Sequence, residues 1–303
     1  MSSWSTEPSW QPPPSGSAVS SQLIARVYAL VLADTSIVGV VAVGSVVSAL
    51  VFAGIAVPAW LLGGVDLMAD TLDWRAWALY VVATWASAFV TVLFSGAVVA
   101  AGVARLEGSP ITARAALGVA WSRRRQLCAW ALVTTVVALL ADQLNRFGLL
   151  GGILRLAADL AWSLATLLVL PIIIVEGQMP RAAIATSVGL IKGRLGLTIR
   201  TKIRLYLPWL AVMFVGVLVT AGGLYAFFHY RHDTPEWSLM GLLLAVVGVL
   251  ATFVALSVQG AADALLNTVL YRHALGLPLA ELDTHALPRL VTPPAPPAPP
   301  AAW

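Results

Sequence analysis

Charge is the scarcest property of this 303-residue sequence. Only 11% of its residues are Asp, Glu, Lys or Arg, whereas 59% are hydrophobic. Soluble domains typically carry about 25% charged residues. A chain with so little charge cannot cover a water-exposed surface, and its mean hydropathy of +0.88 agrees with this. A compact soluble enzyme is therefore excluded, and the sequence predicts an integral membrane protein.

Cysteine, histidine and enzyme motifs are also scarce. Cys128 is the single cysteine, so neither an intramolecular disulfide nor a CxxC site can form. The sequence contains no HExxH, no Walker A motif and no GxSxG elbow, and its four histidines lie outside the long apolar runs. A basic, aromatic-bearing soluble surface for nucleic acid is missing too. We expect no enzymatic activity, no cofactor, no metal site and no nucleic-acid partner.

Three regions differ in composition. Residues 1–21 are rich in Pro, Ser and Trp, and residues 288–303 are mostly Pro and Ala. Such segments bury too little apolar surface to offset the entropy lost on ordering. We predict two disordered tails that flank a membrane domain over residues 22–287.

Long apolar runs fill the region between the tails. A bilayer core of about 30 Å takes roughly 20 helical residues. Six runs are long enough, which predicts an all-α, polytopic transmembrane helix bundle with about six spans. The predicted spans are Ser36–Leu62, Trp74–Val103, Leu127–Leu144, Ile153–Val175, Leu205–Phe228 and Trp237–Leu265.

Three shorter segments are predicted to be amphipathic helices that lie along the cytoplasmic interface. The first is Gln22–Ala33, which Asp34 separates from the first span as an N-cap. The second begins at Ser109, an N-cap before a proline, and ends at Trp121. The third is Pro180–Ile191.

Basic residues divide unevenly between the two predicted sides. With a cytoplasmic N-terminus and six crossings, 14 of the 18 Lys and Arg residues fall inside and 4 outside. The acidic residues divide seven and seven, so the inner side carries +7 and the outer side −3. This bias follows the positive-inside rule and places both termini in the cytoplasm.

A short pattern occurs twice, each time after an even-numbered span. Leu106–Pro110 and Val175–Pro180 both contain Glu-Gly followed by proline, and each precedes an interfacial helix, basic residues and a returning span. Both units run in the same direction, so a duplication would be parallel, not inverted. Ordinary turn chemistry used twice is the alternative interpretation.

Two stretches resemble a known family. Ala161–Pro171 with Val175-Glu176-Gly177 and the Pro180 helix is similar to one element of an uncharacterised family of prokaryotic six-helix membrane proteins, a domain of unknown function numbered 6159. Leu270–Gly276 resembles its Leu-Tyr-Arg-Tyr-Ala signature, although His273 replaces an aromatic residue. Arg194-Leu195-Gly196 departs from a Trp-Gly-Glu-like element. The resemblance implies a multi-pass protein of a prokaryotic plasma membrane and no particular activity.

The predicted inner surface holds the strongest candidate for a binding site. Lys and Arg near an anionic leaflet are each stabilised by about 1 kcal/mol, so clustered basic residues can hold lipid headgroups. Fixing the topology is the alternative role for the same charges. The candidate headgroup contacts are Arg123, Arg124, Arg125, Lys192, Arg194, Arg200, Lys202 and Arg204.

A second cluster is predicted near the outer leaflet, between the third and fourth spans. Asp142 and Arg146 are four residues apart, as are Arg155 and Asp159, so each pair shares one helix face. Carboxylates inside a membrane are costly and often functional, which makes a solute or proton site one hypothesis. Mutual neutralisation of paired charges in a hairpin is the other.

Proline and glycine positions give further expectations about packing. Pro171 and Pro208 lie inside apolar runs and are predicted to kink helices. Small residues allow close helix contacts in membranes. The glycines expected at such contacts are Gly39, Gly44, Gly96, Gly102, Gly222 and Gly223.

Two functions remain open from the sequence. The first is a non-enzymatic membrane module that organises anionic lipid or a membrane-protein partner at the cytoplasmic face. The second is a small-solute transporter or channel subunit that uses the outer cluster. Few polar residues lie in the middle of the predicted spans, which favours the first.

Overall fold

The computed structural model describes residues 24–25, 27–29, 31, 35–61, 74–144, 147–191, 195–230 and 234–277. All regular secondary structure in these residues is helical. The helices are α2 (Thr35–Leu61), α3 (Trp74–Leu106), α4 (Ala113–Ser122), α5 (Arg124–Leu144), α6 (Gly148–Ala165), α7 (Val169–Glu176), α8 (Pro180–Ile191), α9 (Leu195–Tyr230) and α10 (Pro235–Ala274). The predicted all-α fold is confirmed. The predicted tails and Asp34 lie outside the described residues.

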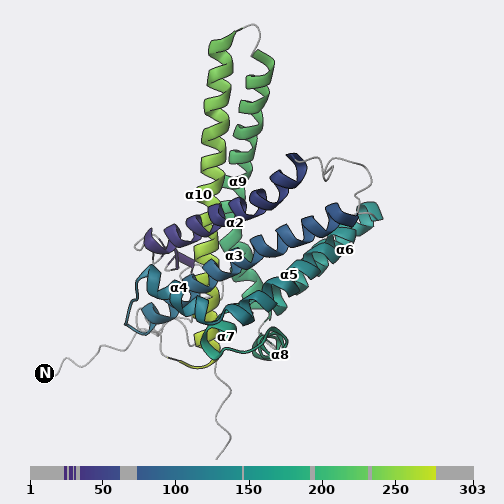
Figure 1. The fold of residues 1–303 in the computed structure, drawn as a ribbon. Helices are drawn as coiled ribbons and strands as arrows, with labels where there is room; N and C mark the ends of the chain where they lie inside the picture. Colours follow the sequence, from purple (N-terminus) through teal and green to yellow (C-terminus); the bar gives the residue numbers. More distant parts are fainter. Residues whose placement is uncertain are drawn as a thin grey trace, which may run out of the picture.

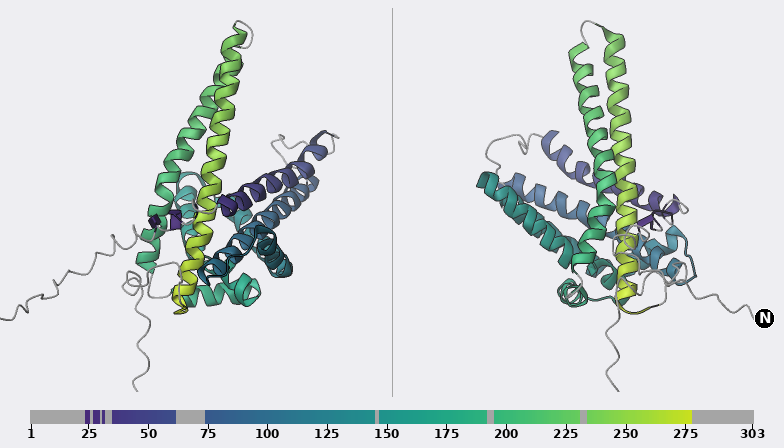
Figure 2. Two further views of the ribbon diagram at one scale, coloured as in Figure 1. Left: turned by 90° about the vertical axis from the view of Figure 1, so that its left-hand side faces the viewer. Right: turned by 180° about the vertical axis from the view of Figure 1, so that it is seen from behind.

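The helices form two arms that diverge from a shared end (Figure 1). One arm is the long antiparallel hairpin of α9 and α10, and the other contains α2, α3, α5 and α6. The short helices α4, α7 and α8 gather with the C-terminal end of α10 where the arms meet, as both views in Figure 2 show. We call this end the base.

The buried core lies at the base and not along the arms. Fully buried side chains come from the second half of α3, from α7 and from the second half of α10, with Val99, Ile172 and Leu266 all at 0% exposure. Towards the tip of the α9–α10 hairpin the apolar side chains are exposed, among them Phe214 and Val249. A helix that is apolar on all sides is suited to lipid. Among the described residues, five helices are long and apolar enough to cross a membrane, or six if the bent pair of α7 and α8 forms one span, so the chain is a polytopic membrane protein.

The predicted fourth span is not one continuous helix. α6 ends at Ala165, and α7 begins at Val169 after a three-residue turn. Pro171 explains the break, because it falls in the first turn of α7, where a missing backbone N–H costs no helical hydrogen bond. The Leu168 backbone N–H donates to the Ser187 hydroxyl at 3.3 Å, which ties the break to α8. A bend of 120° separates α7 from α8.

Helices α4 and α8, which were predicted to lie at the interface after the Glu-Gly turns, differ in how well the sequence predicts their bounds. α8 begins at Pro180 and ends at Ile191 as predicted. For α4, the predicted cap at Ser109 is wrong: Thr112 is the N-cap, and its hydroxyl accepts from the Ala115 N–H at 3.3 Å. Ser109 instead donates to the Ala104 carbonyl at the end of α3.

Glycines bring α9 and α10 into backbone contact. A Cβ on Gly223 would overlap the backbone of Ala245, and one on Gly241 would overlap the backbone of Phe227. Such close approach is the usual packing mode of membrane helices. Of the six glycines predicted at helix contacts, four are confirmed, at positions 44, 96, 102 and 223. Gly39 and Gly222 face open space.

Candidate functional site

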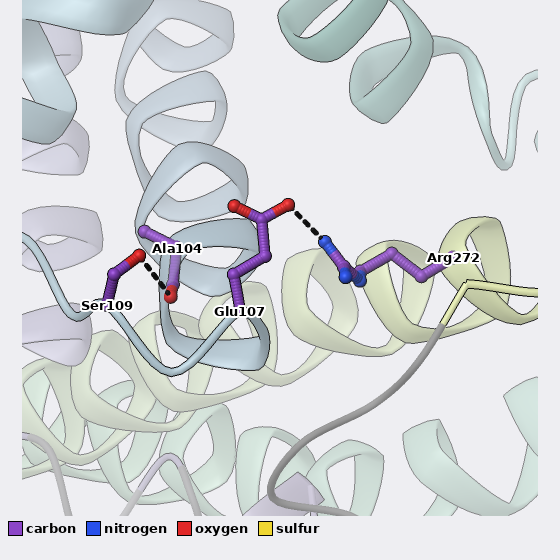
Figure 3. A network of polar contacts seen from close by, with 4 residues as sticks. All are labelled: Ala104, Glu107, Ser109 and Arg272. Carbon is purple, nitrogen blue, oxygen red and sulfur yellow. Dashed lines mark hydrogen bonds and ion pairs between the residues drawn. The ribbon is translucent and has the colours of Figure 1, made fainter.

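An ion pair joins the end of α3 to the end of α10 at the base. Glu107 is the residue after α3, and its carboxylate Oε1 lies 2.5 Å from Nη1 of Arg272 (Figure 3). The Arg272 side chain is 6% exposed and that of Glu107 is 50% exposed. The guanidinium is therefore buried and the carboxylate is still hydrated. The two residues are 165 positions apart, so the ion pair closes the bundle.

A second glutamate binds the neighbouring residue of α10. The Tyr271 hydroxyl donates to Glu176 Oε1 at 2.6 Å. The other carboxylate oxygen of Glu176 accepts from Gln178 Nε2 at 2.5 Å, and Gln178 in turn accepts from Thr186 of α8 at 3.2 Å. Tyr271 is 1% exposed. The Tyr271 side chain is thus buried, and its hydroxyl binds a carboxylate at the base.

Both glutamates belong to the twice-used Glu-Gly pattern, and both turns have the same backbone geometry. Gly108 has φ +75° and Gly177 has φ +69°. This left-handed conformation ends a helix and is open chiefly to glycine. Each copy of the pattern therefore ends its helix with the same backbone geometry. The two glutamates contact adjacent residues of α10, Glu107 contacting Arg272 and Glu176 contacting Tyr271.

Arg123 connects the first unit to the second. It lies between α4 and α5, and a Cβ on Gly177 would overlap its guanidinium. Gln126, one turn later, donates to the Gly177 carbonyl at 3.3 Å. Arg123 therefore packs on the second Glu-Gly turn. We call the two Glu-Gly turns together with Tyr271, Arg272 and Arg123 the base junction.

Arg124 and Arg125 face outwards beside the base junction. Both are exposed, and the guanidinium carbon of Arg124 lies 5.9 Å from the ring centroid of Trp121. Trp121 is itself 53% exposed. An exposed tryptophan beside arginine at a helix end is typical of a membrane interface.

The remaining predicted headgroup contacts fall in the first part of α9 or before it. Lys192 and Arg194 lie outside the described residues. Arg200, Lys202 and Arg204 are in α9, but their side chains are outside the described part of the chain. The basic cluster stays a prediction at these five positions.

The outer cluster contains a salt bridge between two helices. Arg155 Nη1 of α6 lies 2.6 Å from Asp142 Oδ1 of α5, with side-chain exposures of 34% and 46%. Asp142 belongs to one predicted pair and Arg155 to the other. The salt bridge therefore joins the two pairs across the hairpin of α5 and α6. Arg146 and the side chain of Asp159 lie outside the described residues.

Four residues of types that can bind metals, His229, His232, Asp233 and Glu236, lie at the connection between α9 and α10. Among the described residues, no group of three or more His, Cys, Asp or Glu side chains gathers. His229 instead stacks on Tyr225 with ring centroids 5.4 Å apart. His232 and Asp233 lie outside the described residues.

Sequence reasoning missed a polar cluster inside the last span. Gln259, Asp263 and Asn267 are spaced by four residues on α10, and Tyr206 of α9 forms hydrogen bonds with Gln259 and Asp263. The cluster lies at the inner end of the predicted span Trp237–Leu265 and just beyond it, so the expectation for the middle of the spans stays a prediction. The spacing of the three residues is the signal that would have found the cluster, because it places them on one helix face.

Comparison with known proteins identifies a family and nothing more specific. Neither curated proteins nor solved structures give a match. One family model matches residues 76–276, which is about two thirds of the chain and includes the base junction. The chain belongs to this family, DUF6159, a family of unknown function.

Proposed function

We propose that this protein is a non-enzymatic membrane module that holds anionic lipid headgroups at the cytoplasmic face of a prokaryotic plasma membrane. The base of the bundle is the proposed cytoplasmic end. The residues proposed to contact the headgroups in the described part of the chain are Arg124 and Arg125. The basic residues predicted at positions 192–204 would extend the same surface.

The main observation in support of this proposal is that Arg124 and Arg125 are exposed next to Trp121. In the described residues neither arginine forms an ion pair with an acidic side chain. An ion pair with Glu107 occupies Arg272 instead, and Glu176 accepts from Tyr271. Two guanidinium groups that face outwards beside an interfacial tryptophan are suited to phosphate oxygens.

The distribution of buried and exposed residues around α4 supports the same proposal. Ala116 and Ala120 face the core, whereas Arg114, Val119 and Trp121 are exposed. A helix with a buried side of its own and an exposed side that mixes apolar and basic groups can lie in the plane of the headgroups. The predicted split of basic residues between the two sides, 14 against 4, supports the assignment of this end to the cytoplasmic leaflet.

A small-solute transporter that uses the outer cluster is the weaker candidate. Asp142 already pairs with Arg155, and both side chains are at least one-third exposed. A neutralised, hydrated pair at a helix hairpin is suited to joining two helices. Substrate binding would require a group that is still available.

The test is mass spectrometry of lipids and proteins that co-purify with the chain in native lipid discs. Replacing Arg124 and Arg125 by Gln is expected to lower bound anionic lipid at least about twofold, since each basic residue near the leaflet contributes about 1 kcal/mol. Arg123 stays intact because it packs on Gly177. Anionic lipid at the wild-type level in this variant would contradict the proposal, and a reproducible protein partner lost in the variant would assign the surface to that partner.

Arg75 offers a matched control. It also lies over a neighbouring exposed tryptophan, with its guanidinium carbon 5.6 Å from the ring of Trp74. It sits at the other end of α3 and on the predicted outer side. Arg75→Gln is expected to leave the anionic lipid unchanged, which would show that the effect of Arg124 and Arg125 depends on their place in the molecule.

A further inference from the structure

A groove runs along the hairpin of α9 and α10, in the part of both helices that is apolar enough to cross a membrane. It has a volume of about 340 Å³, and all the residues that line it are Ala, Val or Gly. Val212, Val215 and Val247 are 43%, 57% and 57% exposed and form its rim. All the lining residues belong to α9 or α10, the arm that diverges from α2, α3, α5 and α6 (Figure 1). The groove therefore faces the lipid.

Two buried glycines lie in the groove, where α9 and α10 approach each other closely. A Cβ on Gly216 would overlap the Thr252 hydroxyl, and one on Gly248 would overlap the Thr220 hydroxyl. Each hydroxyl donates within its own helix, Thr220 to the Gly216 carbonyl at 2.8 Å and Thr252 to the Gly248 carbonyl at 2.9 Å. These bonds use the hydroxyl hydrogens at the crossing, so the groove beside it presents hydrocarbon to its surroundings.

Small residues form the end of the groove nearest the base. Ala211 and Ala251 line this end, and both are exposed. Val219 follows Ala211 by eight residues on α9, so the groove extends about 12 Å along the helix axis. Arg204 precedes Ala211 by seven residues, which places its backbone about 10 Å nearer the base. A ligand in the groove can therefore extend past the two alanines to the basic start of α9.

We propose that the groove binds one acyl chain of a phospholipid whose anionic headgroup lies at the basic start of α9. The chain is a single file of methylene groups and needs only apolar contacts, which this lining supplies. Apolar surfaces inside a membrane associate through van der Waals packing, and a groove offers a chain more contacts than a flat face does. The inference rests on the proposed function, because it adds a site for the acyl chain of the same class of lipid.

The size of the groove favours an acyl chain over a helix of a second copy. A helix with its side chains is about 10 Å wide, so a length of about 12 Å occupies roughly 900 Å³. This is more than twice the volume of the groove. A helix would therefore rest on the exposed valines of the rim and leave the space below them unfilled.

The test is photolabelling of the purified full chain in lipid nanodiscs. The probe is phosphatidylglycerol with a diazirine in the middle of one acyl chain, and mass spectrometry of the digested chain maps the label. Leu218 and Leu243 are the reference, because they are 55% and 61% exposed on the same hairpin outside the groove. We expect the valines of the groove to be labelled at least about fivefold more than these leucines. Label spread evenly over the exposed residues of the hairpin would overturn the proposal.

Two variants locate the chain. Ala211→Phe combined with Ala251→Phe fills the end of the groove nearest the base and should lower the labelling of its valines at least about fivefold. Both alanines are exposed, so the larger side chains do not displace the core. Ala221→Phe is the matched control, because Ala221 is an exposed alanine of α9 outside the groove, and it should leave the labelling unchanged. Unchanged labelling in the filled variant would overturn the assignment. Disulfide-linked dimers of a chain with Val215→Cys and Cys128→Ser would assign the groove to a second copy and overturn it as well.

A second probe separates this inference from the proposed function. Phosphatidylethanolamine with the same diazirine chain carries no net charge. Equal labelling of the groove by the two lipids would support the chain site and contradict the preference for anionic headgroups. An unlabelled groove, together with the loss of anionic lipid when Arg124 and Arg125 are replaced, would overturn the chain site and support the proposed function.

Discussion

The two Glu-Gly turns have the same local sequence and the same backbone geometry, yet they are held in different ways. Glu107 pairs with the buried guanidinium of Arg272. Glu176 accepts from the neutral hydroxyl of Tyr271. The first contact neutralises a buried charge, whereas the second satisfies a buried hydroxyl. Identical turns can therefore contribute very different amounts to stability, because the partner determines what is lost when the contact is removed.

The glycines of the two turns also differ in their surroundings. Gly108 faces open space, whereas Gly177 lies under the guanidinium of Arg123. The second turn is thus enclosed by side chains of the first unit, and the first turn is not. Stability experiments can separate the role of the shared backbone geometry from the role of these different surroundings.

The largest difference is expected between the two glutamates. Glu107→Ala should lower the free energy of unfolding by about 3 kcal/mol, because it leaves the charge of Arg272 buried without its carboxylate. Glu176→Ala should lower it by about 1 kcal/mol, since both of the hydrogen bonds lost, from Tyr271 and from Gln178, come from uncharged groups. Chemical denaturation in mixed micelles measures both. Equal losses would show that the two contacts are energetically alike.

Substitution of the two glycines tests how much the left-handed backbone and its surroundings each contribute to stability. Gly177→Ala should cost about 2 kcal/mol, because it combines a left-handed conformation with an overlap on Arg123. Gly108→Ala has the same conformational strain in open space and should cost about 1 kcal/mol. A cost at Gly108 that matches or exceeds the cost at Gly177 would refute the idea that the second turn is the more enclosed one.

A smaller effect is expected from the phenol. Tyr271→Phe retains the buried ring and removes one hydrogen bond to a carboxylate, so it should lower the free energy of unfolding by about 0.7 kcal/mol. Because Glu176 is exposed, it can be rehydrated in the variant. A neutral effect on the denaturation midpoint would mean that the ring alone holds this part of α10.

The smallest effect is expected far from the base. Asp142→Asn breaks the salt bridge with Arg155, whose two side chains are well hydrated. Exposed ion pairs contribute little, so the loss should be about 0.5 kcal/mol in the same denaturation assay. A loss as large as that of Glu107→Ala would place an essential contact in the outer cluster and revive the hypothesis of a functional site there.

Local sequence signals predicted most helices because apolar length and composition determine them. The α2, α3, α5, α9 and α10 helices follow from the runs of apolar residues, and Pro180 marks the start of α8. The same reasoning failed where two local signals compete. Pro171 ends one helix and begins another where an unbroken span was predicted, and Thr112 is the cap where Ser109 was expected.

The site was harder to predict because its contacts are distant in sequence. Nothing near Glu107 indicates that it pairs with a residue 165 positions away. The family resemblance pointed to the Glu-Gly turn and to the Tyr271-Arg272 segment separately, but only the fold brings them together. Asp263 was overlooked because an apolar average over a long span hides a single charged residue.

A double-mutant cycle tests the base junction most directly. Glu107→Gln and Arg272→Gln are combined, and the free energies of unfolding of the four proteins give the coupling between the two side chains. We predict a coupling of about 2 kcal/mol for this pair, and close to zero for Glu107→Gln combined with Tyr271→Phe. A coupling between Glu107 and Arg272 below about 0.5 kcal/mol, which is the level of independent sites, would contradict the account.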